Sequence, residues 1–212
     1  MSTRATSVLK RKIQTLGSLI QAGLAHEPWP VLCAALHGNI KPMPETCKRE
    51  TLRHYAKKFG AKVFIETGTF RGETMDFLAP DFNRLVSIEL SPDFFEAARK
   101  KFAGQPKVEL LCGDSADLLP GVISSVDDKA LIWLDAHYSG KATALGPEET
   151  PISRELDIVF SLSKARHVIL IDDAREFGSN PNYPLLPVIE EKARRNCCHY
   201  ECRFDLIRLT PE

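Results

Sequence analysis

The chain has 212 residues, 43% hydrophobic and 26% charged, which is ordinary for a globular protein and long enough for one domain with a sizeable core. Lys and Arg together number 28, as do Asp and Glu, so the net charge gives no indication of a nucleic acid partner. No run of eighteen apolar residues occurs, so we expect no membrane span and a cytoplasmic protein.

Residues 1–46 predict a basic helical extension that leads into a proline-rich linker. Ser7–Leu24 carries apolar residues near helical spacing, and residues 1–62 hold 11 basic but only three acidic residues. A solvated helical face is our interpretation, although contact with an anionic partner and an organelle transit peptide stay open. Four prolines then interrupt regular structure, at Pro28, Pro30, Pro42 and Pro44.

Residues 47–212 predict one domain in which strands alternate with helices. The apolar runs have strand length, and Gly, Pro and Ser separate them from helical segments such as Thr51–Phe59 and the one after Ser91. Near-continuous apolar strands of this kind are typical of a parallel sheet covered on both faces. We therefore expect an α/β fold with a doubly wound, Rossmann-like, mostly parallel sheet closed by a C-terminal antiparallel hairpin. The expected strands are "AKVFIET", "RLVSIEL", "KVELLCGD", "ALIWLDAH", "HVILIDD", "CHYECRF" and "DLIRL".

The six cysteines lack the paired C-x₂-C spacing of a zinc site, and a reducing compartment fits all six. The cluster "CCHYEC" could bind a metal, but we interpret its thiols as small apolar side chains of a late strand.

Carboxylates stand at the end of every predicted parallel strand. In doubly wound folds, ligands bind outside the carboxyl ends of the strands. The sequence therefore predicts one acidic, ligand-binding edge of the sheet, formed by Glu66, Glu89, Asp114, Asp135, Asp172 and Asp173.

The first three strand ends predict a nucleotide site. Glu66, Gly68 and Gly72 form the pattern E-x-G-x-x-x-G, in which glycine permits positive φ and close approach of a ligand to the backbone. A carboxylate at Glu89 can accept both hydroxyls of a ribose, and Asp114 can accept an adenine amino group. A nicotinamide-binding domain would need G-x-G-x-x-G at this turn, and the sequence lacks it.

From Phe64 to Leu209 the chain resembles class I S-adenosylmethionine-dependent methyltransferases. "ETGTFRG", "SIEL", "GDS" and "WLDAHYSG" resemble their first four motifs, although Phe70 stands where the commonest version has a further glycine. The resemblance implies that Gly68 and its neighbours hold the methionine end, Glu89 the ribose and Asp114 the adenine. The expected cofactor-binding residues are Glu66, Thr67, Gly68, Thr69, Gly72, Glu89, Asp114, Ser115 and Asp135.

The last two parallel strands predict the reacting end of the site. Three neighbouring carboxylates repel one another, so they need a proton, a basic partner or a cation. Asp135, Asp172 and Asp173 resemble the metal ligands of metal-dependent catechol and macrolide-sugar O-methyltransferases, which implies Mg²⁺ as a possible second cofactor. The alternative is that Asp172 meets the metal or substrate while Asp173 caps a turn or pairs with Arg175, since adjacent strand residues point to opposite faces.

We expect an S-adenosylmethionine-dependent methyltransferase, with divalent-metal-assisted methylation of a hydroxyl on a small molecule. Asp135 and His137 are the candidate catalytic residues. His137 could act as the general base, because a histidine pKa lies near working pH. Two alternatives stay open: a metal-independent O- or N-methyltransferase with His137 as base, and a non-catalytic nucleotide-binding module. The expected partner is a small hydroxylated substrate, not nucleic acid or membrane, and a homodimer stays open.

Overall fold

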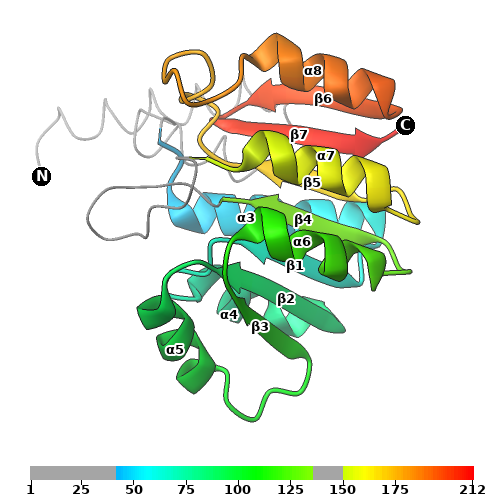
Figure 1. Cartoon of the computed structure of the whole chain (residues 1–212). Helices are drawn as coiled ribbons and strands as arrows, with labels where there is room; N and C mark the ends of the chain where they lie inside the picture. Colours follow the sequence, from blue (N-terminus) through cyan, green and yellow to red (C-terminus); the bar gives the residue numbers. More distant parts are fainter. Residues whose placement is uncertain (1–41, 136–149) are drawn as a thin grey trace, which may run out of the picture.

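The computed structural model describes residues 42–135 and 150–212, which form a seven-stranded sheet with helices on both faces (Figure 1). Most of the predicted N-terminal extension and the predicted base His137 lie outside these residues. The elements are α3 (Glu45–Phe59), β1 (Val63–Thr67), α4 (Glu73–Leu78), the 3₁₀ helix η2 (Ala79–Asp81), β2 (Arg84–Glu89), α5 (Pro92–Lys101), β3 (Val108–Cys112), α6 (Ser115–Ser124), β4 (Ala130–Leu134), α7 (Ile152–Leu162), β5 (Val168–Ile171), α8 (Leu186–Arg195), β6 (Cys198–Arg203) and β7 (Leu206–Pro211).

The sheet has the strand order β3-β2-β1-β4-β5-β7-β6. β1 pairs in parallel with both β2 and β4, so the direction of winding reverses between β1 and β4. β7 runs antiparallel to β5 and to β6. The predicted fold class is confirmed, and the reversal between β1 and β4 is the place where doubly wound sheets bind ligands.

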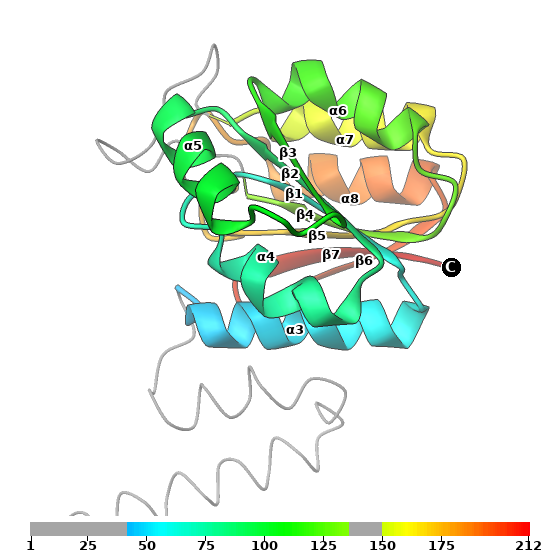
Figure 2. The ribbon, with the colours of Figure 1, turned by 90° about the horizontal axis from the view of Figure 1, so that it is seen from below.

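Two apolar cores pack against the two faces of the sheet. Successive residues of a strand point to opposite faces, so Val63 and Ile65 enter one core and Phe64 enters the other. The core around Phe64 includes residues of α3, α4 and α5, whereas the other core includes residues of α6, α7 and α8. Figure 2 shows α3 and α4 on one side of the sheet and α6, α7 and α8 on the other. All residues of β1, β4 and β5 are buried because helices cover both faces there.

α3 is longer than the sequence predicted. It begins at Glu45 rather than at Thr51, and it ends as predicted at Gly60, which takes the left-handed φ of 67°. The longer helix carries Lys48, which lies within reach of the end of β5.

The local signals at α5 and at the C-terminal hairpin are confirmed. Ser91 caps α5, because its hydroxyl accepts a hydrogen bond from the Phe94 backbone N–H. Phe204 and Asp205 connect β6 to β7 with φ angles of 50° and 63°, the left-handed pair that a two-residue hairpin turn requires.

The cysteines depart in one place from the expected pattern. Cys47 takes part in a disulfide bond, so the expectation of six reduced thiols is wrong at this position. Cys112, Cys197, Cys198 and Cys202 are free.

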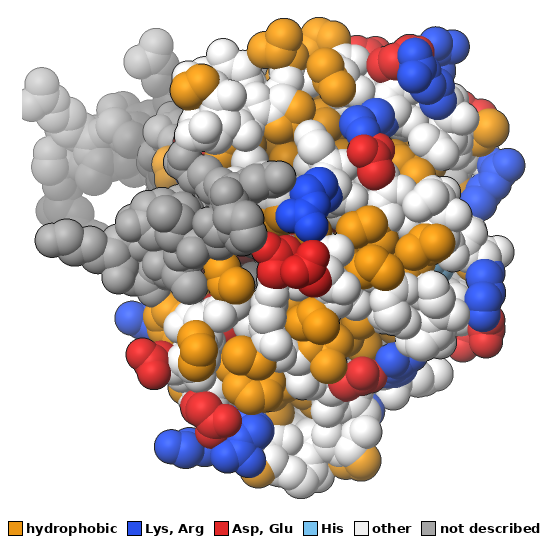
Figure 3. Space-filling view, viewed as in Figure 1, with side chains coloured by type: hydrophobic (Ala, Val, Ile, Leu, Met, Phe, Trp, Pro, Cys, Tyr) orange, Lys and Arg blue, Asp and Glu red, His pale blue; other side chains and the backbone are white. Residues whose placement is uncertain are grey.

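The surface of the described residues carries charges of both signs. On the face shown in Figure 3, acidic and basic side chains are interspersed with apolar ones. No helix within residues 42–135 and 150–212 is long and apolar enough to cross a membrane.

Candidate active site

The predicted acidic edge is formed by the carboxyl ends of five adjacent parallel strands. Glu66 is the second-last residue of β1, Glu89 ends β2, and Asp135 follows β4. Asp114 caps α6 just beyond β3, and Asp172 follows β5. The strand order β3-β2-β1-β4-β5 therefore arranges these side chains along one edge of the sheet.

The turn between β1 and α4 has the backbone conformation that its glycines predict. Gly68, Phe70 and Gly72 have φ angles of 88°, 48° and 64°. A Cβ atom at Gly72 would lie only 2.7 Å from Phe102 Cε2, so the turn has no room for a side chain there. Phe70, which stands where related motifs have glycine, also takes a left-handed φ, at a cost of about 1–2 kcal/mol for an L-residue.

Glu66 lies beneath this turn, in a buried hydrogen-bonded chain. Ser87 Oγ donates to Glu66 Oε1 at 2.7 Å, and Thr69 Oγ1 lies 2.6 Å from Ser87 Oγ. Glu66 is 1% exposed, and burial raises the pKa of its carboxyl to about 8. A neutral carboxyl at this position would ionise when a cation binds next to it.

Glu89 accepts hydrogen bonds from the turn after β1 and from the residues that follow β2. Its Oε2 accepts from the Phe70 backbone N–H at 2.7 Å, and its Oε1 accepts from the Ser91 backbone N–H at 2.8 Å. Each carboxylate oxygen has two acceptor positions, so both can still accept a ligand hydroxyl. The rings of Phe70 and Phe94 pack against each other, with their centroids 4.7 Å apart.

Asp114 has one oxygen engaged at the start of α6. Its Oδ1 accepts from the Ala116 backbone N–H at 2.8 Å and caps the helix. No hydrogen bond to Oδ2 occurs among the described residues, which leaves this oxygen for a donor on a ligand.

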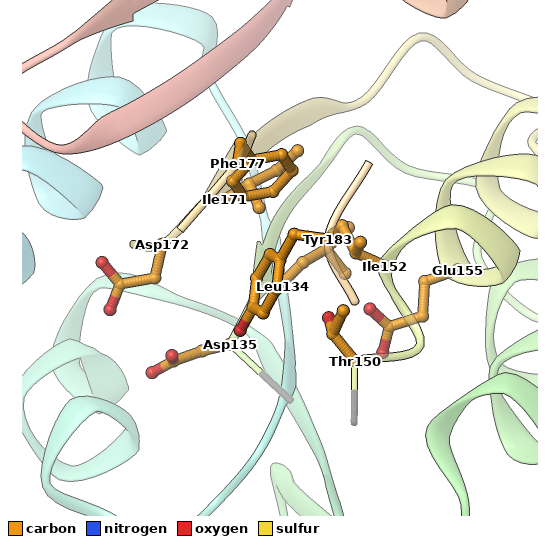
Figure 4. A pocket seen from close by; sticks show the side chains of 9 residues that line it. All are labelled: Leu134, Asp135, Thr150, Ile152, Glu155, Ile171, Asp172, Phe177 and Tyr183. Atoms are coloured by element: carbon orange, nitrogen blue, oxygen red, sulfur yellow. The ribbon is translucent and has the colours of Figure 1, made fainter. Parts of the chain in front are cut away.

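A small pocket, partly open to solvent, lies beyond the ends of β4 and β5. Figure 4 shows Asp135 and Asp172 on one side of it, Thr150 and Glu155 on the other, and the Tyr183 ring between them. None of the described lining residues is basic, so the pocket suits a neutral or cationic molecule. The lining residues are Leu134, Asp135, Thr150, Ile152, Glu155, Ile171, Asp172, Phe177 and Tyr183.

Glu155 is a pocket residue that the sequence analysis did not single out. It is 1% exposed, and its Oε1 is buried without a hydrogen-bond partner among the described residues. Burial raises the pKa of its carboxyl to about 7, and the nearby side chains of Ser115 and Thr67 oppose that rise. Thr67 and Ser115, both predicted to bind cofactor, therefore lie near Glu155. The signal in the sequence was a single acid on the apolar face of α7.

Lys48 enters the predicted metal cluster from α3. Its Nζ lies 2.6 Å from Asp172 Oδ2, 3.9 Å from Asp173 Oδ1 and 2.9 Å from Glu45 Oε1. Burial alone would lower the pKa of Lys48, but the carboxylates of Asp172 and Asp135 raise it overall. Burial and the Asp135 carboxylate raise the pKa of Asp172, and Lys48 opposes that rise.

Asp173 turns toward Arg175. Its φ of 52° redirects the chain at the end of β5, and Arg175 Nη1 donates to its Oδ1 at 2.7 Å. Arg175 also pairs with the buried carboxylate of Asp205 on the C-terminal hairpin. The pairing of Asp173 with Arg175, which the sequence analysis gave as the alternative to metal binding, is therefore the contact observed.

The oxygen donors of Asp135, Asp172 and Asp173 are chemically suited to Mg²⁺, but their arrangement is not. Within residues 42–135 and 150–212, no group of three His, Cys, Asp or Glu side chains is placed to hold a metal ion. Ammonium and guanidinium groups already engage Asp172 and Asp173. The residues present therefore do not fit a divalent ion, and the predicted Mg²⁺ is not supported.

Comparison with solved structures identifies the fold of the chain. No protein-family model matches the chain, and no curated protein matches it significantly. Among solved structures, the O-methyltransferase from Bacillus cereus in complex with SAH has a TM-score of 0.54 and 17% identity, over 96% of this chain and 90% of that one.

Two further solved structures have a similar fold. The O-methyltransferase TomG from Streptomyces achromogenes, in complex with SAM, has a TM-score of 0.52 and 20% identity, over 78% of this chain and 80% of that one. The N-methyltransferase NodS from Bradyrhizobium japonicum WM9 has a TM-score of 0.53 and 15% identity, over 79% of this chain and 97% of that one. The chain has the Rossmann-like fold of class I S-adenosylmethionine-dependent methyltransferases.

Proposed function

We propose that this protein transfers the methyl group of S-adenosylmethionine to a hydroxyl of a small molecule. The observation that carries the proposal is the geometry of Glu89, which lies at the mouth of the glycine turn with both oxygens oriented by backbone N–H groups. A carboxylate held in this way next to the winding reversal of the sheet suits the two hydroxyls of a ribose.

The other predicted cofactor residues have complementary roles in this proposal. Gly68, Thr69 and Gly72 form the turn that approaches the methionine end, and Glu66 beneath it would ionise against the cofactor's positive charges. The second oxygen of Asp114 would accept from the adenine amino group. Thr67 and Ser115 would act through Glu155, whose carboxyl pKa they lower.

The pocket next to Asp135 would hold the acceptor. The acceptor oxygen would attack the methyl carbon in line, forming a C–O bond as the S–C bond breaks and its electron pair passes to sulfur. The hydroxyl proton would pass to a base, for which Asp135 and the predicted His137 are the candidates. The products would be the methyl ether and S-adenosylhomocysteine, and no step passes through a metal ion.

Methylation of an amine is the second candidate. Three acidic residues line the pocket (Asp135, Glu155 and Asp172), and no described lining residue is basic, which would favour a protonated amine as acceptor. A carboxylate that removes the amine proton would then expose the nitrogen lone pair for the same in-line attack.

Transfer of a labelled methyl group to matched acceptors tests the proposal. The acceptors should include pairs that differ only in hydroxyl against amine, assayed with native protein and with Asp135→Asn. Labelled product from a hydroxylated acceptor, strongly reduced in Asp135→Asn, is the expected result. Product from amines alone would select the second candidate. Cofactor binding without turnover on any acceptor would favour the binding-module alternative.

A further inference from the structure

We propose that Lys48 is the resident cation of the aspartate cluster formed by Asp135, Asp172 and Asp173, so that the site needs no divalent metal ion. The inference deepens the proposed function, on which its meaning for catalysis rests, because it assigns to a side chain the positive charge that a metal would supply. Its test on metal binding does not depend on turnover.

The contacts of Lys48 are those of a cation enclosed by carboxylates. Its side chain is 9% exposed, whereas those of Asp172 and Asp173 are 2% and 8% exposed. The 2.6 Å contact with Asp172 is a charge-assisted hydrogen bond between two buried groups. Glu45, one turn before Lys48 on α3, forms a second ion pair with Lys48 at 2.9 Å.

The helix that carries Lys48 does not stabilise the positive charge of its side chain. It lies near the N-terminus of α3, where the helix dipole disfavours a cation. Burial also disfavours the charged form of Lys48. Both effects oppose an ammonium group here, and the carboxylates of Asp172, Asp135 and Glu45 stabilise it.

Lys48 and a divalent ion would compete for the same oxygens. An Mg²⁺ ion needs carboxylate oxygens at about 2.0–2.1 Å in near-octahedral geometry. Asp172 Oδ2 already accepts from Lys48, and Asp172 Oδ1 accepts from the Asp173 backbone N–H at 2.7 Å. A metal ion bound there would also lie close to the ammonium group, and like charges repel strongly in a buried site.

Lys48 is therefore a positioning residue that holds the Asp172 carboxyl at the pocket edge and opposes the rise of its pKa. Removal of the ammonium would leave Asp135 and Asp172 without this cation, while Arg175 would still pair with Asp173. Such a cluster needs another source of positive charge, and oxygen-only ligands suit Mg²⁺ or Mn²⁺. Loss of Lys48 should therefore allow Asp135 and Asp172 to rearrange around a divalent ion, which the arrangement of the described residues with Lys48 in place does not permit.

The experiment compares native protein with Lys48→Ala, Lys48→Arg, Asp172→Asn and Lys48→Ala/Asp172→Asn. Lys57→Ala is the control, because Lys57 lies on the same helix but pairs with Asp81 and is 66% exposed. Mn²⁺ is titrated calorimetrically into each metal-free protein, and the thermal midpoint is recorded in EDTA and in Mg²⁺.

For native protein, Lys48→Arg and Lys57→Ala, the thermal midpoint of each protein should be the same in EDTA as in Mg²⁺. Lys48→Ala should bind Mn²⁺ at least about tenfold more tightly than native protein and should be stabilised by the metal. The added Asp172→Asn change should abolish both effects.

The proposal is overturned if native protein binds one Mn²⁺ per chain and Asp172→Asn removes that binding. It is also overturned if folded Lys48→Ala gains no metal affinity. Should Lys48→Ala fail to fold, the native protein and Lys48→Arg still decide the question. Binding of S-adenosylhomocysteine by native protein tests the proposed function separately.

Discussion

The Lys48 ammonium lies 2.6 Å from the Asp172 carboxylate, although 124 residues separate them in sequence. This ion pair joins α3 to the end of β5, and both side chains are almost fully buried. A buried pair of this kind is costly to break on one side only, because the remaining charge loses its partner without regaining water.

The first prediction concerns this pair. Lys48→Met should lower the free energy of unfolding by about 3–5 kcal/mol, and Lys48→Met/Asp172→Asn should cost less than the sum of its single changes. Urea denaturation of the four proteins gives the coupling energy. The exposed pair Lys164–Asp127 is the control and should show no measurable coupling. Strictly additive single changes at Lys48 and Asp172 would contradict the account.

The second prediction separates ligand recognition from helix capping at Asp114. Asparagine is as good an N-cap as aspartate, so Asp114→Asn should change stability by less than about 0.5 kcal/mol. The change introduces a donor where the proposal needs an acceptor, so affinity for S-adenosylhomocysteine should fall about tenfold or more. Calorimetry measures the affinity, and Asp117→Asn in the same helix should leave it unchanged. An unaltered affinity in Asp114→Asn would remove adenine recognition from this residue.

The third prediction follows from the raised pKa of Glu155, about 7 against an ordinary 4.5. Between these values the folded state retains a proton that the unfolded state has lost, so stability falls as pH rises. The contribution is at most about 3 kcal/mol. Glu155→Gln should reduce that fall between pH 4.5 and 7, measured by urea denaturation across pH. Glu190→Gln, at an exposed position of α8, should leave the fall in stability unchanged. An equal effect of both changes would refute the assignment of this pH dependence to Glu155.

The fourth prediction uses two glycines in different environments. Gly72→Ala should destabilise the protein by about 1–3 kcal/mol, because φ is 64° and the new Cβ would meet Phe102. Gly121→Ala should stabilise it by about 0.5–1 kcal/mol, because Gly121 lies in α6 with no heavy atom within 4 Å of the added Cβ. Thermal denaturation compares the two. Equal effects would mean that the turn before α4 is not constrained as described.

The fold could be predicted because its signals are local. Apolar runs marked the strands, Ser91 and Gly60 marked helix ends, and acids marked the carboxyl ends of the strands. The site was harder to predict because its decisive contacts are not local. Lys48 reaches Asp172 from a helix whose start was placed too late, and no periodicity in the sequence relates the two residues.

Glu155 was missed for a related reason. On its own helix it is a single acid, and only the packing of α7 against the sheet places it beside Thr67, Ser115 and the pocket. The role of Asp173 depended on one backbone angle, which the sequence did not specify. Its φ of 52° directs the side chain to Arg175, and a sequence pattern of two aspartates is compatible with either direction.

The central claim is that the acidic edge from β1 to β3 binds the adenosyl cofactor. Calorimetric titration of S-adenosylhomocysteine into native protein and Glu89→Ala tests it most directly. The account predicts one molecule bound per chain, and an affinity at least about tenfold weaker in Glu89→Ala. Absence of binding to folded native protein at saturating ligand, or binding that Glu89→Ala leaves unchanged, would contradict it.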